Sequence, residues 1–347
     1  MPNGGIITLL PRGSNVAKEV RGVGVTQKDI ANRLGVSRRL VGYALNNQDG
    51  VGDEMRQRIY DIANELGYKP NRAAKTLNTG RTYQIALCLP TLSLPFHAQF
   101  IHHFEELSRD TEYDLVVSTL TKSTSISKVY ADGYIIHESG DIGEITHPTV
   151  LLQSPPFYAK AHGQPYDQIF LDMTDAARQA ILHLLEINKS RIAYVAYDAL
   201  QTMKDPRYNA YYTEVQRRGL MPEVIGFEIG SHDQQRTVSQ RALKKYFCEN
   251  GFPDALFCCN DEIAIGAYRA LRELKRQVPN ETAVIGCDDI PETIELYPSL
   301  TTITNNWRDV CNQAWQLLLS RIECPELAPR APRSKAELLI RESSVIG

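Results

Sequence analysis

The length, composition and charge of the chain exclude several classes of protein. With 347 residues, 43% of them hydrophobic and 23% charged, it is typical of a soluble globular protein of two or three domains. No apolar run reaches the roughly 18 residues that a membrane span needs, and the N-terminus does not resemble a signal peptide. Seven scattered cysteines without a CxxC spacing favour a reducing cytoplasm over a disulfide framework or a metal site.

The net charge of −3 is unevenly spread. Residues 25–81 carry ten Lys and Arg against six Asp and Glu, so the remainder of the chain is acidic. A basic segment on an acidic body is compatible with phosphate binding by that segment alone. Residues 1–24 are interpreted as a loose extension ahead of it.

The pattern after this extension predicts a helix, a tight turn and a second helix. Thr26 is a capping residue for the first helix, and Asp29 follows it three residues later. Gly35 and Val36 form the turn, and Ser37 caps the second helix, residues 38–46. A third helix over 53–66 has apolar residues at helical spacing. This order is the signature of a helix-turn-helix domain, predicted over residues 25–70.

In such a domain the second helix enters the major groove with its N-terminal residues toward the bases. Here those residues are Ser37, Arg38 and Arg39, and an arginine can make a bidentate pair with guanine. The alternative is a three-helix packing module whose arginines are merely solvated.

The next segment, residues 71–80, favours the DNA-binding interpretation. It follows Pro70, has Asn71 as a cap, and is too short to be a stable helix in water. Ala74 and Leu77 would share one face of a helix that forms upon binding. Two such hinge helices in a dimer could lie in the minor groove and wedge their leucines between base steps.

The segment from Val25 to Leu77 resembles the DNA-binding head of the LacI/GalR family of bacterial repressors. The matching pieces are Val25-Thr26, Asp29-Ile30-Ala31, Leu34-Gly35-Val36-Ser37, Leu45-Asn46, Arg58-Ile59, Leu66-Gly67-Tyr68, Pro70-Asn71 and Ala74 with Leu77. The resemblance implies a homodimer on a palindromic, double-stranded DNA operator. The DNA-binding residues it implies are Thr26, Ser37, Arg38, Arg39, Tyr43, Asn46, Asn71, Arg72, Ala74 and Leu77.

The head departs from the family pattern in its second helix. Leu40-Val41-Gly42-Tyr43 stands where the family usually has Thr-Val-Ser-Arg, and the lost Ser and Arg normally touch phosphate or base. Gly52 stands where a Ser or Pro usually caps the third helix. We therefore expect an atypical operator half-site.

From residue 81 onward, short apolar runs alternate with helical patterns, which predicts an α/β body with parallel sheets. This stretch resembles the two-lobed, periplasmic-binding-protein-like body of the same family, on Ala131-Asp132-Gly133, the run Asn260–Ala267, Val284–Asp289, Leu300–Ile303 and Leu339–Ser344. The implied effector and dimerisation domain, 81–347, has a first lobe near 81–170 and 305–325. The second lobe is expected near 171–304 and 326–347.

The resemblance implies a small effector, a carbohydrate, in the cleft between the lobes, where α/β sheets bind ligands. The candidate ligand-binding residues are Phe96, Asp172, Arg207, His232, Asn260 and Asp288. Arg207 would fork onto sugar hydroxyls or a carboxylate, Asp288 would accept hydroxyl protons, and Phe96 would stack on the ring. The alternatives are a solvated helix-start arginine, a loop carboxylate tied to backbone N–H groups, and a helix N-cap at Asn260-Asp261.

The body also departs from the family. Ala210 replaces a glycine, and His232 stands where an aromatic residue usually floors the sugar pocket. Residues 118–130 are shorter than usual, so the second helix of the first lobe is expected to be mostly deleted. Two hypotheses follow: the pocket takes an unusual sugar, or it has lost ligand control.

Competing functions fit the sequence less well. The chain has no Gly-x-Ser-x-Gly, Walker loop or post-strand GxGxxG, so we do not expect an enzyme, a cofactor, a metal or a catalytic residue. A transport solute-binding protein would need a signal peptide and no DNA-binding head. A regulator controlled by a protein partner instead of a sugar stays open. The expected location is the bacterial cytoplasm, in association with the nucleoid and not the membrane.

Overall fold

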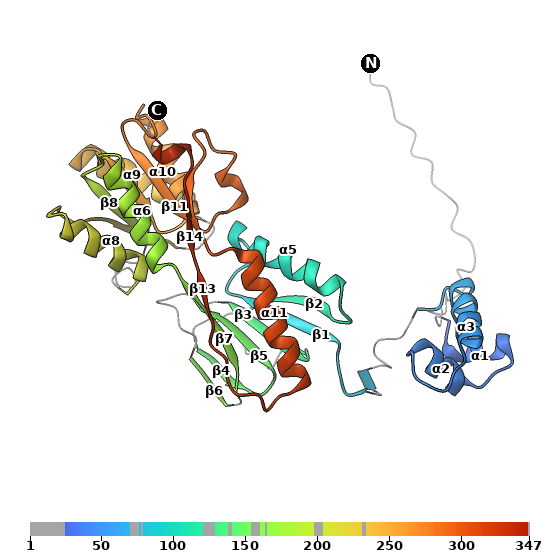
Figure 1. Ribbon diagram of the computed structural model, residues 1–347. Coiled ribbons are helices and arrows are strands. Elements are labelled where there is room, and N and C mark those ends of the chain that lie inside the picture. Colours follow the sequence, from blue (N-terminus) through green and yellow to red (C-terminus); the bar gives the residue numbers. More distant parts are fainter. Residues whose placement is uncertain are drawn as a thin grey trace, which may run out of the picture. The chain divides into compact units, whose positions relative to one another are not determined.

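The computed structural model describes residues 25–69, 76–77, 79–120, 129–137, 141–153, 160–163, 165–197, 204–230 and 234–345. The predictions for the extension 1–24, for Asn71, Arg72, Ala74 and His232, and for most of the shortened segment lie outside these residues. The chain divides into two compact units, residues 1–80 and 81–347, which are described separately below (Figure 1).

The first unit contains the three predicted helices: α1 (Gln27–Leu34), α2 (Arg38–Leu45) and α3 (Asp53–Glu65). Gly35 takes a left-handed backbone conformation, φ 70°, which lets the chain turn sharply between α1 and α2. The apolar faces of the helices meet in one small core, formed by Ile30, Ala31, Val41, Ala44, Val51, Ile59 and Ala63. The helix-turn-helix fold therefore rests on local turn chemistry and a single packed interface.

The starts of α1 and α2 are capped by the predicted residues. At α1 the carboxylate of Asp29 accepts hydrogen bonds from the backbone N–H of Thr26 (2.8 Å) and from its hydroxyl (2.7 Å). Thr26 and Asp29 thus form a capping box. At α2 the Ser37 hydroxyl accepts the N–H of Leu40 at 3.2 Å, as a capping residue should.

The first lobe of the second unit has a six-stranded parallel sheet in the order β13-β7-β5-β3-β1-β2. Its strands are β1 (Gln84–Leu89), β2 (Asp114–Thr119), β3 (Gly133–His137), β5 (Thr149–Gln153), β7 (Asp167–Asp172) and β13 (Arg333–Lys335). Helices α5 (Pro95–Arg109) and α11 (Trp307–Glu323) pack against it. Two further strands, β4 (Asp141–Ile145) and β6 (Lys160–Gly163), form a separate small sheet.

Successive side chains of β1 point to opposite faces of this sheet. Ile85 and Leu87 belong to the main core, whereas Ala86 and Cys88 pack with Ile142 and Ile145 of the small β4–β6 sheet. The small β4–β6 sheet therefore helps to cover one face of the first-lobe sheet.

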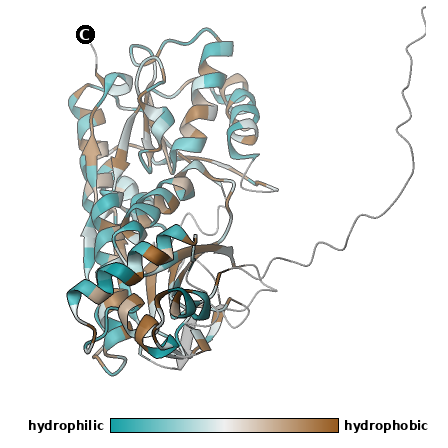
Figure 2. Ribbon diagram, turned by 90° about the vertical axis from the view of Figure 1, so that its right-hand side faces the viewer, coloured by the Kyte–Doolittle hydropathy of each residue, from teal (hydrophilic) through white to brown (hydrophobic). Residues whose placement is uncertain are grey.

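The second lobe has a six-stranded sheet in the order β14-β12-β11-β10-β8-β9, parallel except for β14. Its strands are β8 (Ile192–Tyr197), β9 (Glu223–Phe227), β10 (Ala255–Cys258), β11 (Ala283–Cys287), β12 (Thr301–Thr304) and β14 (Glu337–Leu339). Its helices are α6 (Thr174–Glu186), α8 (Pro206–Arg217), α9 (Gln235–Asn250) and α10 (Asp261–Glu273), with short 3-10 turns η3 (Pro291–Thr293) and η4 (Glu342–Ser344). Figure 2 shows hydrophobic strands between helices that are hydrophilic on their outer sides, which confirms the predicted α/β class.

The chain passes between the lobes three times. It crosses after β7, then between β12 and α11, and last at Ala336, between β13 and β14. The predicted third crossing near residue 325 was wrong, because Arg333–Lys335 still pairs with β7 in the first lobe. The strand is three residues long and largely exposed, so its sequence carries little of the apolar signal that marks a buried strand.

A buried ion cluster ties the last crossing segment to the first lobe. The carboxylate of Asp167 accepts hydrogen bonds from Arg321 (2.8 and 2.9 Å) and from the side chain of Arg330 (2.6 and 3.1 Å). The side chains of Asp167 and Arg321 are 0% and 1% exposed. Burial opposes ionisation of Asp167, but its arginine partners hold its pKa down at about 2. The carboxylate is therefore charged and paired in the folded protein.

Candidate DNA-binding face and ligand cleft

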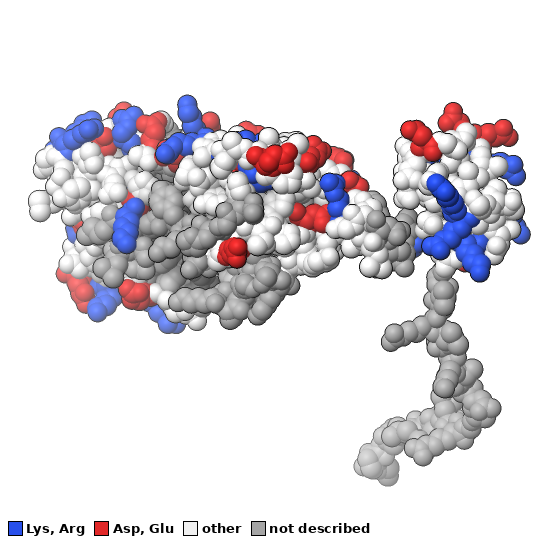
Figure 3. Space-filling view, turned by 90° about the horizontal axis from the view of Figure 1, so that it is seen from below, with Lys and Arg blue, Asp and Glu red and all other residues white. Residues whose placement is uncertain are grey.

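The N-terminal end of α2 presents its polar side chains to solvent. Ser37, Arg38 and Arg39 are exposed, as is Asn46 where the helix ends. Figure 3 shows Lys and Arg gathered on the visible side of this unit, with Asp and Glu toward one edge. The arrangement has the charge and the accessible helix end that major-groove binding requires.

Tyr43 contacts Arg39 one helical turn away. The phenolic oxygen of Tyr43 accepts a hydrogen bond from Nε of Arg39 at 2.8 Å, and the guanidinium carbon lies 5.1 Å from the centre of the tyrosine ring. A second guanidinium nitrogen, Nη2, donates to the same oxygen. Tyr43 thus holds the guanidinium of Arg39 in one orientation.

Leu77 lies near the C-terminal end of the first unit. Its side chain is 86% exposed, an unfavourable place for a large apolar group unless it is buried in a complex. The structure therefore presents the predicted wedge residue to solvent.

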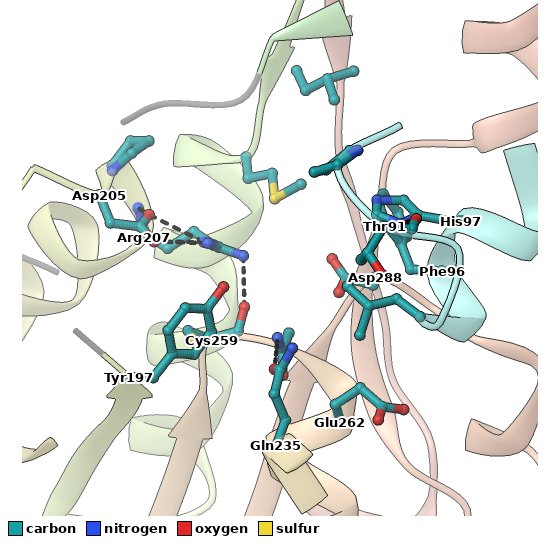
Figure 4. Close-up of a pocket in the computed structure, with 16 residues that line it drawn as sticks. Thr91, Phe96, His97, Tyr197, Asp205, Arg207, Gln235, Cys259, Glu262 and Asp288 are labelled. Atoms are coloured by element: carbon teal, nitrogen blue, oxygen red, sulfur yellow. Dashed lines mark hydrogen bonds and ion pairs between the residues drawn. The ribbon is translucent and has the colours of Figure 1, made fainter. Parts of the chain in front are cut away.

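A cavity of about 160 Å³ lies between the two lobes, and both contribute to its wall. Pro90 follows β1, Tyr197 ends β8, Cys259 follows β10, and Asp288 follows β11. The carboxyl ends of parallel strands from both sheets thus meet here, where α/β proteins bind small molecules. Figure 4 shows the lining side chains arranged around this space.

Arg207 occupies the wall contributed by the second lobe, at the start of α8. Its Nε lies 3.0 Å from both carboxylate oxygens of Asp205, and its Nη2 donates to the same carboxylate at 2.7 Å. Its Nη1 donates to the backbone carbonyl of Cys259 (Figure 4). Burial opposes the positive charge, but the Asp205 carboxylate more than compensates and raises the pKa of Arg207 well above its usual range.

Asn260 is both a cavity residue and a helix cap. Its side-chain oxygen accepts the N–H of Ile263 at 2.9 Å, so the cap interpretation is correct for Asn260. Its amide nitrogen donates to Gln235 at 2.7 Å. The side-chain nitrogen of Gln235 is buried and donates no hydrogen bond within the described part of the protein. Gln235 thus offers a spare donor at the cavity wall.

Phe96 and Asp288 line the cavity near the first lobe. Phe96 is the second residue of α5 and makes edge contacts with Phe100 and Trp307, at centroid distances of 5.0 and 4.7 Å. Trp307 also donates from its indole N–H to the carbonyl of Asp288 at 2.7 Å. An aromatic wall therefore faces the carboxylate end of the cavity.

Asp172 does not line this cleft, contrary to the prediction. It ends β7, accepts the N–H of Thr174 at 3.1 Å, and lies 3.4 Å from Arg333. It borders a second cavity of about 690 Å³ between α6, α8 and β13. As the last residue of β7, Asp172 directs its side chain away from the cleft and toward this second cavity.

Sequence reasoning missed most of the cleft lining, including the polar residues Asp205 and Gln235. Asp205 stands two residues before Arg207, and this spacing together with Pro206 could have indicated a helix cap beside the arginine. Gln235 carries no such local signal, because it reaches the cleft through the packing of its helix.

We also searched the described residues for metal sites and membrane-spanning helices. No group of His, Cys, Asp and Glu there could hold a metal ion, and no helix in that part of the chain is long and apolar enough to cross a membrane. Cys258 and Cys259 are buried and are free thiols. Burial raises the pKa of Cys259 to about 12, so its thiol is protonated at neutral pH.

Two family descriptions match separate parts of the chain. Residues 26–71 match bacterial regulatory proteins of the lacI family, and residues 181–344 match a periplasmic binding protein-like domain. Similar proteins include the HTH-type transcriptional repressor PurR of Mannheimia succiniciproducens, 25% identical over 92% of this chain and 98% of its own length. The HTH-type transcriptional regulator RegA of Clostridium saccharobutylicum is 25% identical with the same coverage.

Solved structures share the fold over most of the chain. The lac repressor dimer bound to operator and the anti-inducer ONPF has a TM-score of 0.77, 22% identity, and covers 93% of this chain and 99% of its own. The complex of the transcriptional regulator CelR with cellobiose has a TM-score of 0.62, 22% identity, and covers 92% and 99%. These proteins are transcriptional regulators and not enzymes.

Proposed function

We propose that this chain, which matches the lacI family of bacterial regulatory proteins in its head and a periplasmic binding protein-like domain in its body, is a regulator of that family. We propose that it binds a palindromic operator as a homodimer, controlled by a sugar or sugar derivative in its cleft. It is a DNA-binding transcriptional regulator with an effector-binding domain. The observation that carries the proposal is the pairing of an exposed, basic N-terminus of α2 with a polar cavity lined by both lobes of one body.

Arg38 and Arg39 supply the proposed base contacts. An exposed arginine at the start of a recognition helix can reach the O6 and N7 acceptors of guanine, which is worth roughly 1–3 kcal/mol of discrimination. Tyr43 restricts Arg39 to one orientation, so we expect Arg39 to read a fixed position of the half-site. We expect Ser37, Thr26 and Asn46 to contact the DNA backbone or flanking bases, and Leu77, with Asn71, Arg72 and Ala74, to enter the minor groove.

The cleft offers what a sugar ring needs. Phe96 and the neighbouring apolar side chains provide a surface for the ring face, Asp288 provides acceptors for hydroxyl protons, and Gln235 provides a spare donor. Sugar complexes are known for similar proteins, such as CelR with cellobiose. His232 is proposed to close the remaining side of the pocket in place of the family's aromatic residue.

Ligand and operator binding are linked in this proposal through the lobes. A ligand that contacts both lobes binds best to one lobe arrangement and therefore shifts the population toward it. The three chain crossings transmit that change to the start of β1, which follows the hinge segment directly. By linkage, the operator must then alter ligand affinity by the same factor as the ligand alters operator affinity.

Selection of bound duplexes from a random DNA pool tests the operator, with full-length protein at near-physiological salt. We expect a two-fold symmetric site with a flexible pyrimidine–purine step at its centre, bound by a dimer in light scattering. Enrichment of no sequence, with or without the sugars below, would contradict the proposal. As a regulator of chromosomal genes, the protein is placed by this proposal in the bacterial cytoplasm, in association with the nucleoid.

A thermal-unfolding screen of neutral sugars tests the ligand. We expect at least one to raise the melting temperature, and the increase to be lost in Asp288→Asn. A screen in which no sugar stabilises the protein, while a protein captured on the folded dimer changes operator affinity, would favour control by a protein partner.

A further inference from the structure

The charge balance of the cleft points to a ligand class. We propose that Asp205 cancels the charge of Arg207, so that the cleft rejects anionic ligands and accepts uncharged, polyhydroxylated ones. The inference rests on the proposed function, because it concerns the same cleft. It differs from the sequence-based expectation, in which Arg207 could fork onto a carboxylate.

Each of the three nitrogens of Arg207 already donates to a group of the protein. Two of its three nitrogens, Nε and Nη2, point to Asp205 at 2.7–3.0 Å. The third, Nη1, donates to the carbonyl of Cys259 and lies 3.5 Å from the sulfur of Cys287. An entering carboxylate or phosphate would have to displace Asp205 before it could make a bidentate contact with this guanidinium.

Asp205 is held firmly in place. It is the N-cap of α8, and its Oδ1 accepts the backbone N–H of Arg207 at 2.8 Å. The phenolic hydroxyl of Tyr194 lies 3.4 Å from its other oxygen, and the aspartate is only 6% exposed. Since the side chains of Arg207 and Asp205 are 16% and 8% exposed, solvent screens the pair weakly. Breaking it would leave a poorly solvated charge.

Arg207 has no second arginine or lysine beside it on the described part of the wall. It is the only Lys or Arg among the described residues that line the cavity. Glu262 is paired with Arg236, which also contacts Glu292 at 2.9 Å. Asp288 adds a further carboxylate to the wall. The described wall therefore carries a surplus of negative charge, which repels an anion at short range.

The neutral groups of the wall favour a different ligand. The buried amide nitrogen of Gln235 needs an acceptor, which a hydroxyl or ring oxygen supplies without bringing a charge. Asp288 can accept hydroxyl protons, and Phe96 can pack on C–H groups. An uncharged sugar or polyol meets all three requirements.

Inorganic phosphate is the probe, measured on the full-length protein by thermal unfolding at constant ionic strength against chloride. We expect 20 mM phosphate to change the melting temperature of the wild type no more than that of Arg207→Gln. Asp205→Asn should instead be stabilised by phosphate by about 3 °C or more, because it keeps a side-chain cap but exposes the cation. The double variant Asp205→Asn with Arg207→Gln should lose this stabilisation, which controls for phosphate bound elsewhere.

Two results would overturn the proposal. One is a phosphate stabilisation of the wild type that disappears in Arg207→Gln, since Arg207 would then be available to anions. The other is a folded Asp205→Asn that gains no phosphate response. If Asp205→Asn does not fold, Asp205→Ser, which also keeps a capping oxygen, repeats the test. The comparison of the wild type with Arg207→Gln requires neither Asp205 variant. Operator selection is independent of this result, so failure here and failure of the proposed function can be told apart.

Discussion

Leu77→Ala separates DNA binding from stability better than any other substitution in the head. In the free protein the Leu77 side chain is 86% exposed, so its truncation removes almost no folded-state contact. If the side chain is buried between base steps in the complex, the change deletes three carbon groups, each worth roughly 0.8 kcal/mol. We expect a loss of about 2 kcal/mol per head, or roughly 30-fold in affinity.

A dimer inserts two such leucines, so the combined loss for a symmetric operator should approach 1,000-fold. The assay is a fluorescence-anisotropy titration of the selected operator at fixed salt, alongside urea unfolding of the free protein. Leu92→Ala is the matched control, because Leu92 is also exposed, at 51%, and does not line the cleft. A loss below threefold for Leu77→Ala, or an equal loss for Leu92→Ala, would refute the wedge.

Three further outcomes follow from the structure. Tyr43→Phe removes the acceptor of Arg39 and should relax the base preference at one half-site position in DNA selection, with stability changed by less than about 0.5 kcal/mol; an unchanged preference would show that the contact is incidental. Asp167→Asn leaves Arg321 buried without its counter-ion and should lower the free energy of unfolding in urea by about 3–5 kcal/mol; a loss under 1 kcal/mol would contradict this. Burial raises the pKa of Asp261 to about 7 from 3.8, so the folded state binds the proton more tightly, and this contribution to stability is complete below pH 4 and lost as the pH rises through 7. The loss of up to about 4 kcal/mol should be absent from the pH profile of Asp261→Asn, and an identical profile would disprove it.

The sequence by itself determined the features that depend on neighbours along the chain. Gly35 marks the turn, Ser37 caps α2, and the apolar residues of three short helices recur with the helical period, so the head could be predicted nearly to the residue. Strands such as β1 and β11 were equally visible, because a strand covered on both faces is a continuous apolar run. The resemblance to known repressors then supplied the order of the lobes.

Only the tertiary structure decided which side chains face one another. Asp172 borders the second cavity because β7 ends on that side of the crossing, and β13 joins the first lobe although its exposed residues carry no strand signal. Asp167 and Arg321 are 154 positions apart and meet through the packing of α11 on the sheet. The hydrogen bonds of Arg207 also depend on tertiary structure. Asp205 is only two residues away in sequence, but the carbonyl of Cys259 comes from the end of β10, the strand beside β8. Periodicity records which face of an element is buried, whereas the partner of a polar group is set by the packing of elements distant in sequence.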